Sequence, residues 1–140
     1  MKRALALAVL LAAPGWAAAE WTTIASSERL VIEIDPDLVR AQGEFAMAYT
    51  RATFTAPQPV DGKPDVTQQS QLQLLAIDCA ASAATVVGVI LYPGPYGRGE
   101  IIEQTTRPRA EWNPRPAPAG SLVDKIVRVA CEELARRERK

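Results

Sequence analysis

Alternation of apolar and polar residues dominates the chain up to about residue 105, whereas a helical pattern appears only after residue 120. Residues 30–35 alternate with a period of two, which predicts a half-buried strand that Pro36 stops. Residues 45–54 give the longest such signal, with bulky side chains on one face and small ones on the other. Further strands are predicted over residues 21–25, 71–79, 85–92 and 100–105.

The predicted strands place apolar side chains on both faces of a sheet. Leu75, Ile77 and Cys79 share one face, and we expect this face to look toward the C-terminal helix. The other face is expected to receive a second apolar set, made of Leu72, Leu74, Val86, Ile90 and Tyr92. A single helix covers only one face. The second face must therefore curl over itself, pair with another copy in a homodimer, or hold a small apolar ligand.

Proline and glycine mark the connections. Residues 56–65 contain three prolines and predict a mobile loop, which the polar residues 67–70 extend. Residues 93–99 predict the turn of a hairpin. Residues 107–118 carry four prolines and predict an extended connector, with Trp112 packed over a sheet edge.

The segment from Ser121 to Leu134 predicts a capped amphipathic helix. Ser121 is a good N-cap, and Asp124 three residues later forms a weaker variant of the capping box. The apolar residues fall on one broad arc with Cys131 at its edge. Four basic residues end the chain. Without a second basic stripe they indicate a solvated helix terminus and not a nucleic-acid site.

These elements predict an α+β domain: an antiparallel sheet of about five or six strands with a C-terminal helix packed on one face. Residues 20–140 are expected to form this single domain. Two cysteines in an exported chain predict one disulfide, between Cys79 and Cys131, which ties the helix to the sheet.

The N-terminus predicts export. Lys2 and Arg3 precede an apolar run over residues 4–13, and small residues lead up to an expected cleavage site after Ala19. The run is too short to span a membrane, which takes roughly 20 residues. No cysteine lies near the cleavage site, so a lipid anchor has no attachment point. We expect a protein of the periplasm, the cell surface or the medium.

The sequence contains no recognisable arrangement of catalytic or metal-binding residues. It contains no histidine, so its serines lack the usual base. The Asp35-Pro36-Asp37 sequence is read as a strand-ending turn, because a calcium loop needs more oxygen donors at set spacings and a glycine. We expect no catalytic residues, no metal site, no cofactor and no nucleic acid as partner, and an enzyme is the least favoured hypothesis.

The best candidate binding surface combines arginines and aromatic residues in the loops after residue 95. These residue types are favoured in protein contacts. The alternative is that they are scattered loop charges around a packing tryptophan. The candidates are Tyr96, Arg98, Arg107, Arg109, Trp112 and Arg115.

The order of features resembles the bacterial surface-adhesin protein E family. The resemblance rests on Trp21, the strand over residues 31–35, residues 39–43, the Asp78-Cys79 pair, Trp112-Asn113-Pro114, and the helix from Pro118 to Cys131. It implies a small antiparallel sheet with a C-terminal helix tied across it by the Cys79–Cys131 disulfide. It also implies adhesion to host extracellular-matrix proteins such as vitronectin and laminin.

The sequence therefore supports two hypotheses for the function. The leading hypothesis is a non-enzymatic exported binding module that engages a protein through its loops or open sheet face. The alternative is a periplasmic protein that holds a small apolar ligand in the sheet cavity.

Overall fold

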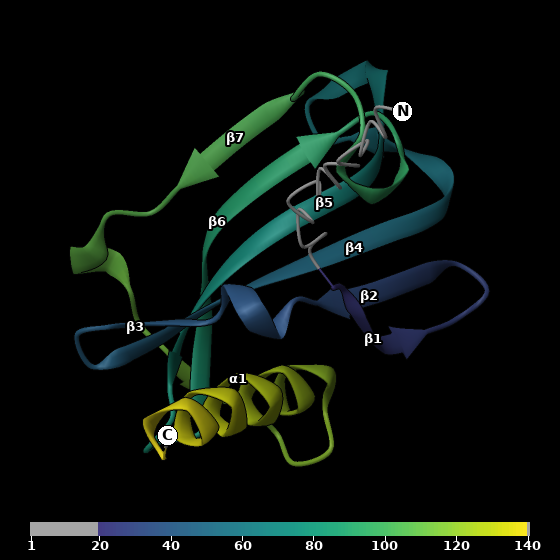
Figure 1. The fold of residues 1–140 in the computed structure, drawn as a ribbon. Coiled ribbons are helices and arrows are strands. Elements are labelled where there is room, and N and C mark those ends of the chain that lie inside the picture. Colours follow the sequence, from purple (N-terminus) through teal and green to yellow (C-terminus); the bar gives the residue numbers. More distant parts are fainter. Residues whose placement is uncertain (1–19, 140) are drawn as a thin grey trace, which may run out of the picture.

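The computed structural model describes residues 20–139, which form an antiparallel sheet with one α-helix packed against it (Figure 1). Along the sheet the order is β1-β2-β4-β5-β6-β7, with β3 paired to β4 and β8 paired to β6. The expected signal peptide, residues 1–19, lies outside the described residues. The elements are β1 (Thr22–Ser26), β2 (Leu30–Ile34), β3 (Arg40–Gln42), β4 (Phe45–Val60), β5 (Lys63–Asp78), β6 (Ala83–Tyr92), β7 (Glu103–Thr106), β8 (Arg115–Pro116) and α1 (Leu122–Glu138).

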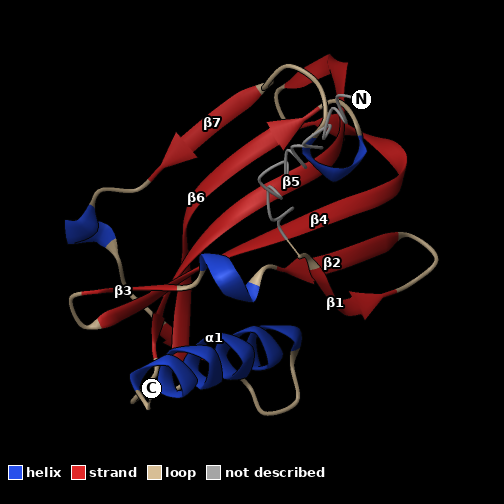
Figure 2. Ribbon diagram, viewed as in Figure 1, coloured by secondary structure: helices blue, strands red, loops and turns tan. Residues whose placement is uncertain are grey.

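This arrangement confirms the α+β fold expected from the sequence, with a helix at the C-terminus of an antiparallel sheet (Figure 2). The sheet has eight strands among the described residues, more than expected. The additional strands are β3 and β8, which have three and two residues. Elements this short carry no readable alternation, because a period of two needs at least four residues to be recognised.

The prediction of a mobile loop over residues 56–70 is wrong. Strands β4 and β5 have 16 residues each and form one long hairpin that turns at Asp61 and Gly62, with Gly62 at φ 74°. Beyond Phe54 the hairpin lies outside the reach of β2 and β6, so β4 and β5 pair only with each other. Prolines in sheets are confined to edge strands, strand starts and bulges, and both strands of this arm are edge strands. This two-stranded arm therefore tolerates its prolines, although its register shifts between Thr53 and Gln58.

The main core lies between α1 and the sheet. Ala46 and Ala48 form the small face of β4, which lets the helix approach closely, while Leu75 and Ile77 supply bulk from β5. From α1 the core receives Ile126, Val127 and Ala130. The predicted disulfide closes this layer between Cys79 and Cys131, whose Cα atoms are 5.8 Å apart.

A β-bulge in β6 changes the sheet face on which one residue was predicted to lie. Leu74 is opposite Gly88 and Leu75 is opposite Val86, so Val87 is the extra residue. The bulge breaks the alternation, and Val86 packs against the helix-side core instead of the other face. Leu72 and Ile90 remain paired on the face away from α1, as expected.

The helix begins as the sequence predicts. The Ser121 hydroxyl accepts a hydrogen bond from the Asp124 N–H at 3.2 Å. The Asp124 carboxylate accepts from the Arg128 guanidinium at 2.6 Å and from the Gly120 N–H at 2.9 Å. These two hydrogen bonds, that from Arg128 first, hold the pKa of Asp124 below its ordinary value.

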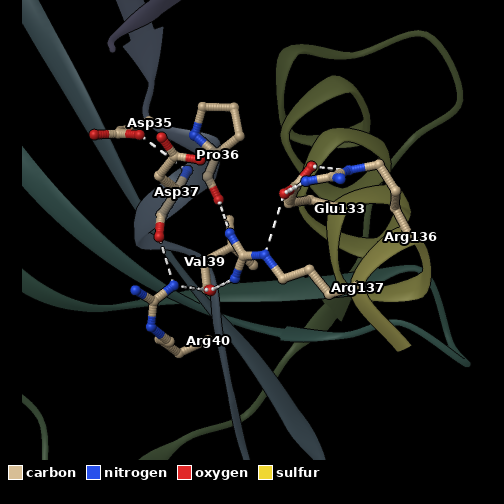
Figure 3. A network of polar contacts seen from close by, with 8 residues as sticks. All are labelled: Asp35, Pro36, Asp37, Val39, Arg40, Glu133, Arg136 and Arg137. Atoms are coloured by element: carbon tan, nitrogen blue, oxygen red, sulfur yellow. Dashed lines mark hydrogen bonds and ion pairs between the residues drawn. The ribbon is translucent and has the colours of Figure 1, made fainter. Parts of the chain in front are cut away.

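The basic C-terminus is only partly a solvated helix end. Arg137 donates hydrogen bonds to the carbonyls of Pro36, at 2.6 Å, and Val39 (Figure 3). Glu133 accepts from both Arg136 and Arg137 on its own helix. The last turn of α1 is thereby attached to the chain between β2 and β3, a contact that a helix pattern alone does not reveal. Within the described residues, no helix is long and apolar enough to cross a membrane.

Candidate functional site

The sheet face turned away from α1, here called the outer face, carries the bulky side chains of β4. Phe45, Met47, Tyr49 and Arg51 alternate along an uninterrupted register and therefore point to the same side. Met47 lies in a small second core with Ala76 and Val87. Unlike the helix side, the outer face has no covering α-helix among residues 20–139 (Figure 1). Its polar and aromatic groups are half-buried on β4, whereas Tyr96 and Arg109 are exposed.

Arg51 organises the first group on this face, the Arg51 cluster, which consists of Trp21, Glu33, Arg51 and Tyr96. The guanidinium carbon of Arg51 lies 4.3 Å from the ring centroid of Trp21 and 5.3 Å from that of Tyr96. The Arg51 guanidinium also donates to the Glu33 carboxylate at 3.1 Å and 3.2 Å. Both partners of this ion pair are largely buried, with side chains 16% and 11% exposed. Loss of Arg51 would leave a buried carboxylate without its counter-ion, so the ion pair is structural, and Tyr96 is the exposed member of the cluster.

Tyr96 is presented by a tightly held loop. Its backbone lies in the left-handed region at φ 56°, a conformation that bulky residues rarely adopt, and the residue is 46% exposed. The fully buried Ser70 hydroxyl donates to the Gly94 carbonyl at 2.6 Å and accepts from the Gly97 N–H at 2.8 Å. The Thr53 hydroxyl accepts from the Tyr96 N–H at 3.3 Å. Strain of this kind persists only where the surroundings fix the backbone, as Ser70 and Thr53 do here.

A second group, the Arg109 cluster, consists of Phe45, Arg109 and Trp112. The guanidinium carbon of Arg109 lies 5.3 Å from the ring centroids of both Phe45 and Trp112. The two rings meet edge to face with centroids 5.6 Å apart. Trp112 packs against the second core on the outer face and not over a sheet edge as expected. The reason is that the segment between β7 and β8 crosses the face to reach β4.

Between the two clusters the outer face is apolar. Arg51 lies opposite Leu72, which lies opposite Ile90, and Tyr49 lies opposite Leu74 in the next row. The side chains of Tyr49, Leu72, Leu74 and Ile90, together with residues 104–106 of β7, line a hollow of about 110 Å³. Phe45 and Arg51 are six residues apart on one strand, so the clusters are separated by about 20 Å.

The structure brings together only part of the predicted binding surface. Tyr96 belongs to the Arg51 cluster, while Arg109 and Trp112 belong to the Arg109 cluster. Arg107 adjoins the second cluster, where its carbonyl accepts a hydrogen bond from the Trp112 indole at 3.0 Å. Arg98 ends the Tyr96 loop, and its carbonyl accepts from the Gly94 N–H.

Arg115 lies elsewhere. It belongs to β8 and pairs with Ala84, which packs against the core on the α1 side. We therefore leave Arg115 out of the candidate site.

The sequence analysis missed four members of these clusters as site residues, namely Trp21, Glu33, Phe45 and Arg51. For Phe45 and Arg51 the signal was present in the bulky face of the strand over residues 45–54, whose alternation continues from Tyr49 to Arg51. Which loops contact that face depends on how distant segments of the chain are arranged. The alternation within one strand gives no information about this arrangement.

The groups on the outer face are of the residue types that protein contacts favour. Arginine stacked on aromatic rings offers N–H donors beside broad apolar surfaces. Among residues 20–139, no group of three or more cysteine, aspartate and glutamate side chains is placed to hold a metal ion.

A C-terminal helix tied by a disulfide to an antiparallel sheet defines the scaffold as a small disulfide-bonded α+β domain. The sequence matches the family described as surface-adhesin protein E over residues 21–132, and the chain belongs to this family. Among curated proteins, none matches the chain at a significant level.

Two solved structures share the fold. The structure of Haemophilus influenzae protein E has a TM-score of 0.58 at 14% sequence identity, covering 83% of this chain and 96% of that chain. The selenomethionine form of protein E from the same organism has a TM-score of 0.55 at 13% identity, covering 72% and 78%. Similarity at this level of identity establishes the scaffold, and the outer face must be judged on its own residues.

Proposed function

We propose that this protein is a non-enzymatic exported binding module that engages another protein through the outer face of its sheet. The observation that carries the proposal is the presence of two arginine–aromatic clusters on one accessible face, with an apolar strip between them. Membership of the surface-adhesin protein E family supports the same conclusion.

The physical argument concerns preorganisation. Tyrosine, tryptophan and arginine dominate binding energy at protein interfaces, and they are most effective when their conformations are fixed before binding. Tyr96 is fixed by Ser70 and Thr53, and Trp112 by its indole hydrogen bond. A partner therefore loses little entropy in ordering these side chains.

For the partner, we propose an extracellular-matrix protein of the kind that the family resemblance implies, with vitronectin and laminin as first candidates. The place of action would be the cell surface or the medium. A small apolar ligand is less well supported, because the hollow of about 110 Å³ is well below the 300–1,000 Å³ typical of ligand sites.

Surface plasmon resonance tests the proposal with protein purified from the periplasm of an expression host. Immobilised vitronectin and laminin are probed with the wild-type protein and with Tyr96→Gly. Glycine adopts the positive φ without strain, so this variant removes the ring while preserving the loop. Arg115→Gln is the matched control, because Arg115 is exposed and lies off the outer face.

The proposal predicts saturable binding that Tyr96→Gly weakens about tenfold, as expected for an interface hot spot, and that Arg115→Gln leaves unchanged. Absence of binding to either protein, or equal loss in both variants, would contradict it. A doubled molecular mass at high concentration, abolished by Tyr96→Gly, would instead assign the outer face to a homodimer.

A further inference from the structure

The two arginine–aromatic clusters differ in one component. Arg51 is stacked on two rings, and its N–H groups are taken by the Glu33 carboxylate at 3.1 Å and 3.2 Å. The Arg51 cluster is therefore internally complete, with two aromatic faces and a counter-ion for one guanidinium.

Arg109 is held in the same way but lacks the counter-ion. Its guanidinium lies over the rings of Phe45 and Trp112 at equal distances of 5.3 Å. Among the described residues, 20–139, no carboxylate lies within ion-pair distance of it. The residue itself is exposed, so its donors face solvent.

The surroundings of Arg109 fix its position. Gly43 lies directly beneath it, and a Cβ at this position would stand 2.9 Å from an Arg109 guanidinium nitrogen. Gly43 has φ 59°, so the turn before β4 both reverses the chain and leaves room for the guanidinium. The Trp112 ring is oriented by its indole hydrogen bond to the Arg107 carbonyl. The guanidinium is thus preorganised without being neutralised.

We infer that Arg109 receives its carboxylate from the bound partner, and that the outer face recognises an acidic segment of a protein, with an aspartate or glutamate on Arg109. This inference rests on the proposed function and specifies the chemistry of the partner. A second positive charge, Arg107, lies two residues before Arg109 and the acidic Glu111 two residues after it, and all three residues are exposed. Complementary charge of this kind fixes the register of a partner and accelerates its association.

The chemistry favours arginine in this role. A guanidinium presents paired donors that match the two oxygens of a carboxylate, and its rigid fork loses little freedom on binding. The Arg109 guanidinium carbon lies 5.3 Å from the centroids of Phe45 and Trp112, and the exposed residue forms no ion pair with the described part of the chain, so its N–H donors can meet a carboxylate. Acidic residues flanked by apolar ones would place their apolar side chains on the strip formed by Leu72, Leu74 and Ile90.

A peptide titration followed by nitrogen-15 NMR tests the inference. The probe is a capped tetrapeptide with two glutamates and two leucines, and the comparison peptide has glutamine at both acidic positions. The reporters are the Trp112 indole N–H, assigned by its absence in Trp112→Phe, and the Arg109 Nε–H. The Trp21 indole is an internal control, because the Arg51 beneath it already has its carboxylate.

We expect the acidic peptide to shift the Trp112 and Arg109 signals saturably and to leave the Trp21 signal in place. The shift weakens when ionic strength rises from about 0.01 M to about 0.15 M, because exposed charges are screened. Arg109→Gln abolishes the response, whereas Arg115→Gln, at an exposed arginine off the outer face, preserves it. An equal response to the glutamine peptide, a response that survives Arg109→Gln, or no response at all would overturn the inference.

Binding to immobilised vitronectin or laminin separates this inference from the proposed function. If Tyr96→Gly weakens that binding and Arg109→Gln does not, the inference fails while the proposed function stands. If neither matrix protein binds but the acidic peptide titrates as expected, the proposed function fails and the inference stands.

Discussion

Replacement of Ser70 by alanine is the most informative single test of how the outer face is built. The Ser70 side chain is completely buried, and its hydroxyl makes two hydrogen bonds, to the Gly94 carbonyl at 2.6 Å and from the Gly97 N–H at 2.8 Å. Ser70→Ala leaves both backbone groups without their partner. A buried polar group left unsatisfied costs about 1–3 kcal/mol. Two such groups are affected, and the loop can relax toward water, so we expect the unfolding free energy to fall by about 2–4 kcal/mol in total. This is a large share of a small domain's stability.

Urea unfolding monitored by tryptophan fluorescence measures this loss as a change in midpoint at constant slope. Amide hydrogen exchange then shows where the destabilisation occurs, and we expect the largest increase in exchange rate at the Gly97 N–H. Ser27→Ala is the matched control, since the Ser27 hydroxyl also bonds turn backbone but is exposed. If Ser70→Ala costs no more than Ser27→Ala and leaves exchange at Gly97 unchanged, the view that Ser70 holds the Tyr96 loop is refuted.

Three further predictions concern the helix and its attachments. Replacing Cys79 and Cys131 together by serine should lower the unfolding free energy by roughly 4 kcal/mol, the chain-entropy value for a loop closed across 52 residues, as measured by urea unfolding. Arg137→Gln should lower the unfolding free energy by about 1–2 kcal/mol in the same assay, because it removes the hydrogen bonds to the carbonyls of Pro36 and Val39 in the segment that connects β2 to β3. Arg139→Gln is the neutral comparison. The lowered pKa of Asp124 means that its contribution to stability is present above the unfolded pKa of about 4 and is lost as pH falls through the folded pKa. Asp124→Asn should therefore destabilise the protein at pH 7 and flatten the acid side of its stability profile.

Local patterns in the sequence predicted the elements well where a single period governs many residues. The strand over residues 45–54 and the helix after Ser121 both follow this rule, and both are present. The disulfide between Cys79 and Cys131 followed from the presence of two cysteines in a chain with an export signal. These inferences need no knowledge of how distant segments meet.

The failures share a different cause. The prolines at residues 57, 59 and 64 suggested a loop because a proline interrupts most sheets, but here they lie in an arm whose strands pair only with each other. Val86 was assigned to the wrong face because one inserted residue, Val87, breaks the alternation. Gly88 follows it directly, but a glycine in a strand does not by itself show which residue is inserted. In both cases the environment of the strand, and not its composition, decides the outcome.

The candidate site was only half visible for the same reason. Tyr96, Arg109 and Trp112 were recognisable as loop residues of the types that bind proteins. Arg51 was not, because an arginine in an alternating strand is typical of a solvated face. Its role depends on Trp21 and Tyr96, which approach it from segments 30 and 45 residues away along the chain.

Hydrogen–deuterium exchange of the exported protein, alone and with saturating vitronectin or laminin, tests the central claim most directly. The account predicts protection of residues 94–98 and 107–112 together with the middle of β5 and β6, while the exposed side of α1 exchanges as in the free protein. Protection confined to α1 or to the arm formed by residues 55–68, with the outer face unchanged, would contradict it.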